Sequence, residues 1–375
     1  MALTERYSNV GGSGAADGTS QANAWDIADV LKATSVAAGG QRVNHQGDWS
    51  PTGANITFDL VATDNLPFLL QGYDTVPQDL EGLPNSGLEP VITLDNTGNR
   101  YFNLSSNRYT TFRSLHITGT TDGSLIRNTH GQKFEYCRLE NLQATGSPRL
   151  VTLEATTCSF DTCYLAMTST TSGTYYFNFG SDYFGVFTNC VFDGGYMVFN
   201  ATRNISLVNC LFLNQYMRCI SYGTGNNYQI LIVNCTFVGA RDQVAIGADN
   251  VANQKAKIIS RCIFASFDAR GLWFTDATDN KSNTVSNNAI WNNIGDVGGG
   301  IKNATIPPTN TVTLTEDPFV DSAGGNYSLK PSVVGAYGYS QGFHSLPNTP
   351  NRRDIGASQH AASNISLIGG RGLVG

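Results

Sequence analysis

The chain has 375 residues, of which 41% are hydrophobic and only 14% are charged, and it contains 40 glycines. A chain of this length can bury a large core, and this composition suits a fold with many turns. The net charge of −6 and the pI near 5.3 argue against a nucleic-acid-binding protein, which would normally present a basic face.

The first forty residues predict an arm followed by a short capping helix. Residues 1–22 are rich in Gly, Ser, Ala and Asp, which favours a flexible or draped arm. Asn23 can cap a helix that carries Trp25 and Leu31 on one face, and the glycine pair at 39–40 would end it. Such a helix would cover the end of the structure that follows.

The amino terminus lacks the basic and apolar regions of a secretory leader, and no apolar stretch is long enough to span a membrane. We therefore expect a protein that is made without export and without a membrane anchor. The eight cysteines fit folding in a reducing compartment.

A six-residue motif recurs between about residues 110 and 295. Phe134-Glu-Tyr-Cys137-Arg-Leu139 is a clear copy, with apolar residues at its first, fourth and sixth places. Successive fourth places lie 22, 26, 27, 20, 25, 27 and 26 residues apart. The eight residues at the fourth place are Leu115, Cys137, Cys163, Cys190, Cys210, Cys235, Cys262 and Asn288. The motif predicts a strand whose three apolar side chains face inward, and the variable spacing predicts loops at one corner.

One such strand cannot bury its apolar face alone, so successive coils must stack about 4.7 to 4.9 Å apart. We therefore predict an all-β fold, a right-handed parallel β-helix or solenoid, with an N-terminal capping helix and an irregular C-terminal cap and tail. The expected division is 1–40 for the arm and helix, 41–302 for the coils, 303–360 for the cap and 361–375 for an extended tail. The opening strands are expected at 42–49, 56–61 and 67–70.

The six cysteines of the motif predict an internal file of thiols, a structural ladder that packs as small hydrophobic side chains. Side chains that project in parallel do not readily adopt the torsion angle of a disulfide. The paired spacing of a zinc site is absent, and no histidine accompanies the file. We expect neither a metal nor a cofactor.

Several segments resemble the superfamily of right-handed parallel β-helix, pectate-lyase-like proteins. They include Gly11-Gly-Ser-Gly-Ala-Ala-Asp17, Leu70-Gln-Gly-Tyr73, Asp317-Pro-Phe-Val-Asp321 and Arg353-Asp-Ile-Gly-Ala357. The stretch Val333-Val-Gly-Ala-Tyr-Gly-Tyr-Ser departs from the usual pattern of the C-terminal cap. The resemblance implies architecture only, because this fold carries lyases, hydrolases, adhesins and structural proteins.

No catalytic cluster is visible in the sequence. A lyase would need aligned aspartates for Ca²⁺, but Asp193, Asp242 and Asp268 follow their cysteines by 3, 7 and 6 residues. Asp161, Asp182 and Asp193 are the candidates for a glycosidase pair, although each is more typical of a solvated turn. His116 falls between two inward places and is expected to face solvent.

Two groups of residues are candidates for partner contact. Tyr175 and Tyr176 begin an aromatic segment that either stacks on sugar rings or fills a wide core. The tail carries five aliphatic residues, which a partner would cover unless the tail is disordered. These five residues are Ile365, Leu367, Ile368, Leu373 and Val374.

From these features we expect a non-enzymatic structural protein of a bacteriophage virion, a capsid decoration or tail-associated protein assembled in the host cytoplasm. Its partners would be other virion proteins and further copies of the chain, with a homotrimer suggested by analogy. One alternative is a tailspike that binds or degrades polysaccharide, as a lyase or glycoside hydrolase, and another is an extracellular bacterial adhesin.

Overall fold

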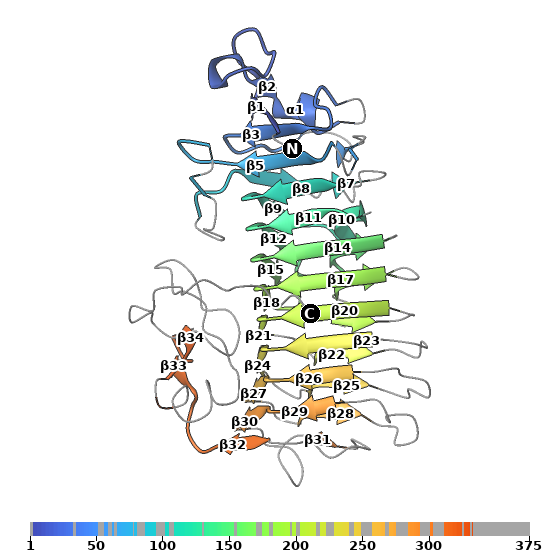
Figure 1. The fold of residues 1–375 in the computed structure, drawn as a ribbon, viewed down its shortest axis with the longest axis vertical. Helices are drawn as coiled ribbons and strands as arrows, with labels where there is room; N and C mark the ends of the chain where they lie inside the picture. The colour runs from blue at the N-terminus through green and yellow to red at the C-terminus, as the bar shows by residue number, and fades with distance from the viewer. Residues whose placement is uncertain are drawn as a thin grey trace, which may run out of the picture.

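The computed structural model gives the molecule as one elongated stack of strands (Figure 1). The residues that the structure describes are 3–32, 35–51, 56–58, 62–63, 66–77, 79–80, 87–94, 102–104, 109–129, 131–153, 156–169, 175–179, 183–195, 197–199, 203–214, 218–222, 229–239, 244–248, 257–266, 270–274, 284–292, 301–302, 311–324, 326–330 and 332.

Each complete coil contains one strand in each of three sides of the stack. Sheet A is the twelve-stranded side, sheet B is the ten-stranded side, and the third side consists of two five-stranded sheets, C and D. All pairings between coils are parallel, as the recurring motif requires. The parallel β-helix predicted from the sequence is confirmed.

The strands of sheet A follow in spatial order as β2 (Trp25–Asp26), β1 (Thr4–Asn9), β3 (Gln41–His45), β5 (Phe68–Gly72), β8 (Thr110–Arg113), β11 (Lys133–Glu135), β14 (Thr156–Asp161), β17 (Tyr183–Thr188), β20 (Arg203–Val208), β23 (Gln229–Val233), β26 (Lys257–Ser260) and β29 (Thr284–Ser286).

The strands of sheet B are β6 (Val91–Leu94), β9 (His116–Gly119), β12 (Arg138–Asn141), β15 (Tyr164–Met167), β18 (Val191–Asp193), β21 (Leu211–Leu213), β24 (Thr236–Val238), β27 (Ile263–Ala265), β30 (Ala289–Trp291) and β32 (Val312–Leu314). Sheet C contains β4 (Ile56–Thr57), β7 (Phe102–Asn103), β10 (Ser124–Thr129), β13 (Arg149–Leu153) and β16 (Tyr175–Phe179). Sheet D contains β19 (Met197–Phe199), β22 (Arg218–Tyr222), β25 (Val244–Ala248), β28 (Arg270–Phe274) and β31 (Ile301–Lys302).

The recurring motif is not one strand, as its apolar pattern suggested, but two strands joined at the corner between sheets A and B. An unbroken strand would place the first and fourth side chains on opposite faces. The third residue of the motif instead adopts a left-handed conformation, with φ of 54° at Tyr136 and 55° at Asn234. This bend turns the chain from sheet A into sheet B, so that Phe134, Cys137 and Leu139 are all buried.

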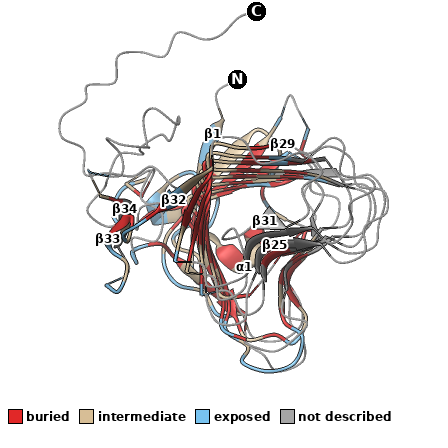
Figure 2. Cartoon of the chain, turned by 90° about the horizontal axis from the view of Figure 1, so that it is seen from below, coloured by how far each residue is buried: buried red, intermediate tan, exposed pale blue. Residues whose placement is uncertain are grey.

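Stacked phenylalanines fill much of the core inside the coils. On sheet A the ring centroids of Phe134 and Phe160 lie 5.0 Å apart with an interplanar angle of 5°. On sheet B the rings of Phe192 and Phe212 lie 4.5 Å apart with an angle of 6°. A view along the stack shows many of the described strand residues coloured as buried, with helix α1 lying within the outline of the coils (Figure 2). Parallel in-register pairing places like residues on one another, which gives the core its periodicity.

The N-terminal cap is built differently from the predicted arm and helix. Strand β1 pairs with β3, so the beginning of the chain forms part of sheet A. Helix α1 is short, Ile27–Val30, and Asp26 caps it by accepting a hydrogen bond from the backbone N–H of Ala28 at 3.0 Å. Asn23 is not the cap, because its Oδ1 accepts from the N–H of Ala15. The 3-10 helix η1 (Gln21–Asn23) precedes β2, and α1 covers the end of the core (Figures 1 and 2).

His45 is buried beneath this cap, where its Nδ1 lies 3.2 Å from the Oγ of Ser8. Burial lowers the pKa of His45 from 6.5 to about 4, against the opposing effects of hydrogen bonds to Ser8 and Gly47. The imidazole is therefore neutral in the folded protein at neutral pH.

At the other end, β32 continues sheet B beyond residue 302, where the stack was expected to close. The chain then forms an antiparallel hairpin of β33 (Phe319–Asp321) and β34 (Asn326–Leu329), which lies outside the stack beside sheet B (Figures 1 and 2). The predicted tail, 361–375, lies outside the described residues. Within the part of the chain that is described, no helix is long and apolar enough to cross a membrane.

Candidate functional site

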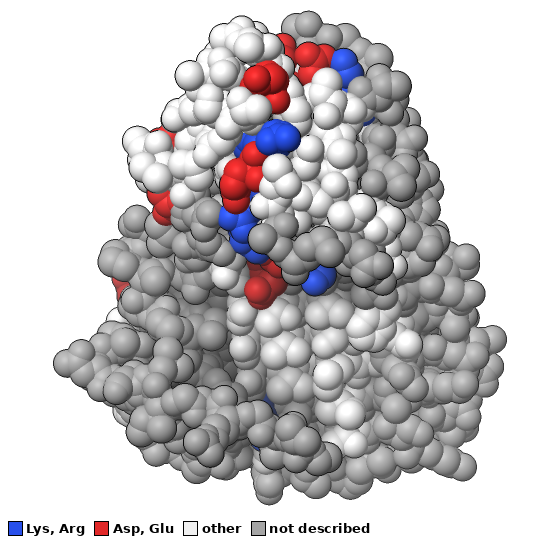
Figure 3. All heavy atoms as spheres, turned by 45° about the horizontal axis from the view of Figure 1, so that its top comes forward, with Lys and Arg blue, Asp and Glu red and all other residues white. Residues whose placement is uncertain are grey.

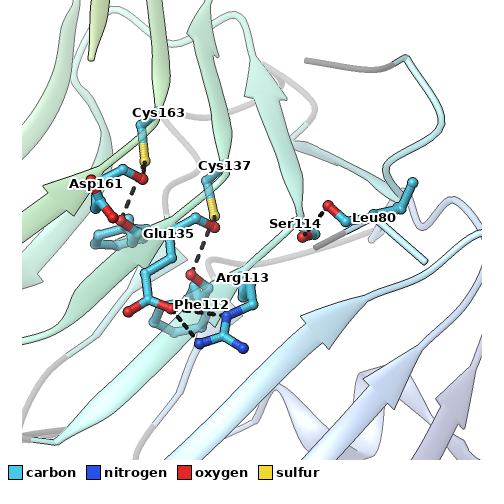
Figure 4. Close-up of polar contacts among 9 residues, drawn as sticks. Leu80, Phe112, Arg113, Ser114, Glu135, Cys137, Asp161 and Cys163 are labelled. Atoms are coloured by element: carbon cyan, nitrogen blue, oxygen red, sulfur yellow. Dashed lines mark hydrogen bonds and ion pairs between the residues drawn. The ribbon is translucent and has the colours of Figure 1, made fainter. Parts of the chain in front are cut away.

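The six cysteines of the motif all lie at the corner between sheets A and B with their side chains buried. The Sγ of Cys137 lies 3.3 Å from the carbonyl oxygen of Phe112 in the preceding coil, and the Sγ of Cys163 lies 3.3 Å from that of Phe134 (Figure 4). Cys190, Cys210, Cys235 and Cys262 make the same contact at 3.4 to 3.7 Å.

The thiols of this file are poor nucleophiles and poor metal ligands. Burial raises the pKa of Cys163, Cys190, Cys210 and Cys235 well above the ordinary thiol value. All eight cysteines are described, and all are free. Among the described residues, no group of three or more histidines, cysteines or carboxylates is arranged to hold a metal ion. The file therefore contributes packing and hydrogen bonds rather than reactivity.

The outer face of sheet B carries a continuous set of interacting polar side chains. We call it the polar file, and its members are His116, Arg138, Glu140, Tyr164, Asp193 and Asn214. They come from β9, β12, β15 and β18 and from the residue that follows β21. Because neighbouring strands lie about 4.8 Å apart, the file extends along the stack with about that repeat from coil to coil.

Glu140 lies next to His116, the first member of this file, and is almost fully buried. Its carboxylate accepts from the His116 Nε2 at 2.8 Å and from the Arg138 guanidinium at 2.7 Å. Burial alone would raise the pKa of Glu140, but the hydrogen bonds from His116 and Arg138 lower it below the ordinary value. Glu140 is therefore an anion held between two donors.

Asp193 is at the other end and accepts from the Tyr164 hydroxyl at 2.5 Å and from the Asn214 Nδ2 at 2.7 Å. The two ends are joined by Arg138, whose guanidinium carbon lies 5.3 Å from the centre of the Tyr164 ring. Two carboxylates, a guanidinium, an imidazole, a phenol and an amide thus form one connected surface of donors and acceptors.

The C-terminal hairpin covers the outer face of sheet B beyond the polar file. Beyond Asp193 the outward side chains of sheet B become apolar, and Phe319 and Leu329 of the hairpin are buried with several of them. Tyr327 packs against the cluster of Val191, Leu211 and Leu213, which Tyr164 also contacts. The covered part of sheet B therefore adjoins the polar file.

The sequence did not reveal the polar file, although two offsets identify it in retrospect. His116, Arg138 and Tyr164 each follow the fourth place of their motif by one residue, and Glu140 and Asp193 follow it by three. The residues at these offsets differ in chemistry from coil to coil, so the polar file is not the row of aligned aspartates that a Ca²⁺ lyase would need. The side chain of His116 lies on the outer face and is partly exposed, in agreement with the prediction that it faces solvent.

The other predicted residues do not join this site. Asp161 accepts from Asn189 Nδ2 at 3.2 Å at the edge of sheet A, and Asn209 donates in turn to Asn189 at 3.2 Å. Asp182, Asp242 and Asp268 lie outside the described residues. Tyr175 and Tyr176 belong to β16, but their side chains are not described. The tail residues also lie outside the described residues; they are Ile365, Leu367, Ile368, Leu373 and Val374.

A second charged pair lies across the corner, on sheet A. The Arg113 guanidinium contacts the Glu135 carboxylate at 2.5 Å through Nη2 and 2.8 Å through Nε (Figure 4). It is the same kind of partly buried arginine–glutamate pair, although Glu135 is 24% exposed and Glu140 only 8%, and it serves as a comparison for the polar file.

The architecture is that of a pectate-lyase-like parallel β-helix. A rhamnogalacturonan lyase structure matches with a TM-score of 0.50 and 11% identity over 95% of both chains. A PL6 family polysaccharide lyase from Pseudopedobacter saltans matches with a TM-score of 0.38 and 12% identity, over 78% of this chain and 92% of that one. No protein-family model and no curated protein sequence matches the chain. At such low identity the likeness shows the fold alone.

Proposed function

We propose that this protein binds a polysaccharide along the outer face of sheet B, through the polar file. The observation that carries the proposal is the connected set of charged, amide and phenolic groups that extends from Glu140 to Asp193. Sugar hydroxyls need donors and acceptors close together, and an acidic sugar would also bind Arg138. The similar structure of 0.50 TM-score is described as a rhamnogalacturonan lyase, which is in keeping with this proposal.

Binding fits the file better than hydrolysis does. Glu140 and Asp193, the two carboxylates that a glycosidase would use, lie on strands two apart, so their Cα atoms are about 9.6 Å from one another. Such an enzyme needs one carboxylic acid with a raised pKa. The pKa of Glu140 is lowered instead, and its nearly buried carboxylate is held by His116 and Arg138, which suits a group that orients Arg138 rather than a proton donor.

The test is calorimetric titration of the purified protein with one acidic and one neutral polysaccharide, polygalacturonate and dextran. Arg138→Gln should weaken binding about tenfold or more, since hydrogen bonds to charged groups contribute about 1.5–3 kcal/mol. Tyr164→Phe removes one hydroxyl and should weaken binding less.

Arg113→Gln is the matched control, because it breaks a similar arginine–glutamate pair on sheet A and should leave the affinity unchanged. Equal affinity of all four proteins, or no binding of either polysaccharide, would contradict the proposal. Release of new reducing ends or unsaturated sugars would instead identify an enzyme.

The second candidate is the non-enzymatic structural role in a virion that the sequence suggested. Exposed apolar side chains on sheet A, at Phe184, Leu231 and Ile258, favour contacts with protein. Neither similar structure is described as a virion protein. Co-purification of the chain with intact phage particles tests this role, which is compatible with sugar binding.

A further inference from the structure

The outer face of sheet A changes character along the stack. Four of its outward positions in the coils of β8 to β14 are charged, whereas the described outward side chains from β17 to β29 are uncharged, some apolar and some polar, such as Ser206 and Ser260. The charged ones are Arg113, Lys133, Glu135 and Asp161. The apolar ones, which we call the neutral face, are Phe184, Val186, Val208, Leu231, Val233 and Ile258. Figure 3 shows the charged side chains gathered over the upper coils.

Several side chains of the neutral face are exposed to solvent. Phe184 is 40% exposed, Leu231 is 36% exposed and Ile258 is 43% exposed. Leu231 and Ile258 are direct neighbours on β23 and β26, so they form one patch rather than scattered contacts. An exposed apolar patch on a sheet is normally covered by another layer or by a partner.

On sheet B, an apolar outer surface is covered by another part of the same chain. There the outward side chains also become apolar in the later coils, and the chain's own hairpin covers them through Phe319, Tyr327 and Leu329. Sheet A has the same change in composition, but no described element covers its neutral face in this way.

The chain that follows the hairpin offers a suitable cover. Residues 361–375 contain five Ile, Leu or Val residues. The only charged side chain in this segment is that of Arg371. This composition matches an uncharged apolar surface. Thirty-five residues lie between Leu329 and Ile365, enough to span up to about 120 Å when extended. Sheet A adjoins sheet B at a two-residue corner, so the neutral face is well within that reach.

We propose that the neutral face of sheet A is the docking surface for the C-terminal segment, residues 361–375, of the same chain. The segment adds an apolar layer over β17 to β26, as the hairpin does over sheet B. Tethering favours this occupant over a separate molecule, because the connecting chain sets a high effective concentration.

Cross-linking of full-length protein tests the proposal. Ile258→Cys and Leu367→Cys are combined, and mild oxidation is followed by non-reducing electrophoresis and peptide mapping. The native thiols are buried and do not compete. The control combines Leu367→Cys with Lys133→Cys, because Lys133 is exposed in the same outward row of sheet A, five strands from Ile258.

The proposal predicts a cross-link within one chain, with a yield at least about fivefold above that of the control pair. A covalent dimer selective for Ile258 would overturn it and identify a second copy as the occupant. Equal yields in the two pairs, or no cross-link, would also overturn it.

Proteolysis gives a second measurement that does not depend on oxidation. Ile258→Asp should speed tryptic cleavage after Arg371 by about tenfold, because cleavage follows the population of the undocked segment. Lys133→Asp should leave the cleavage rate unchanged. An unchanged rate in the Ile258 variant would refute docking on this face, whatever cross-links form.

Discussion

Acid should loosen the N-terminal cap through His45. The folded-state pKa of about 4 lies below the value of 6.5 for a free imidazole, so the unfolded segment binds a proton more readily than the folded one. The neutral imidazole therefore imposes no penalty above pH 6.5. The penalty develops as the pH falls from 6.5 and is complete below pH 4.

The size of the effect follows from the shift. At 1.36 kcal/mol for each pKa unit, lowering the pH from 7 to 4 should destabilise the cap by about 3 kcal/mol, and about 2 kcal/mol should already be lost at pH 5. His45→Leu removes the titration, so the variant should show a smaller decrease. Carboxylates that titrate near pH 4 affect both proteins equally.

The assay is hydrogen exchange measured by mass spectrometry on peptides that cover β1 and β3, corrected for the intrinsic exchange rate at each pH. A solenoid can open locally at one end, so local exchange is more direct here than global unfolding. Parallel pH profiles for the wild-type protein and His45→Leu would refute the reasoning, because they would show that His45 is not protonated during opening.

Three further predictions concern the coils. Asn234→Val should lower the free energy of unfolding in urea by about 1–2 kcal/mol, because a β-branched residue is disfavoured at the left-handed corner; equal stability would refute the role of the bend. Phe212→Ala should lower it by about 3–5 kcal/mol, because it removes a fully buried ring from the stack. Cys210 should react with a thiol reagent only after denaturation, and a rapid reaction in native protein would contradict its burial.

The repeat was visible in the sequence because parallel stacking places equivalent residues on one another. Phe134 and Phe160 are paired in the structure as the motif aligned them. The corner was missed because the apolar spacing of three was interpreted as strand alternation. Asparagine at the third place, as at Asn209 and Asn234, was the available sign, since it tolerates the left-handed region better than most residues.

The candidate site was harder to predict because its residues differ from coil to coil. Arg138 and Tyr164 share an offset but not a chemistry, and a search for one repeated residue type overlooks them. The covering hairpin depends on contacts between distant segments, which local periodicity does not contain. The apolar outward residues Val191 and Leu211 were the indirect indication that something covers sheet B.

The constant length of the corner between sheets A and B indicates where the chain can accept insertions. All eight corners from Ser114–Leu115 to Asn287–Asn288 contain two residues, although the coils differ by up to seven residues in length. Insertions are therefore absorbed at the other turns, where lengthening a loop costs little entropy. We expect foreign peptides grafted into those turns to be displayed without disturbing the register of the stack, which would make this chain a scaffold with one invariant edge.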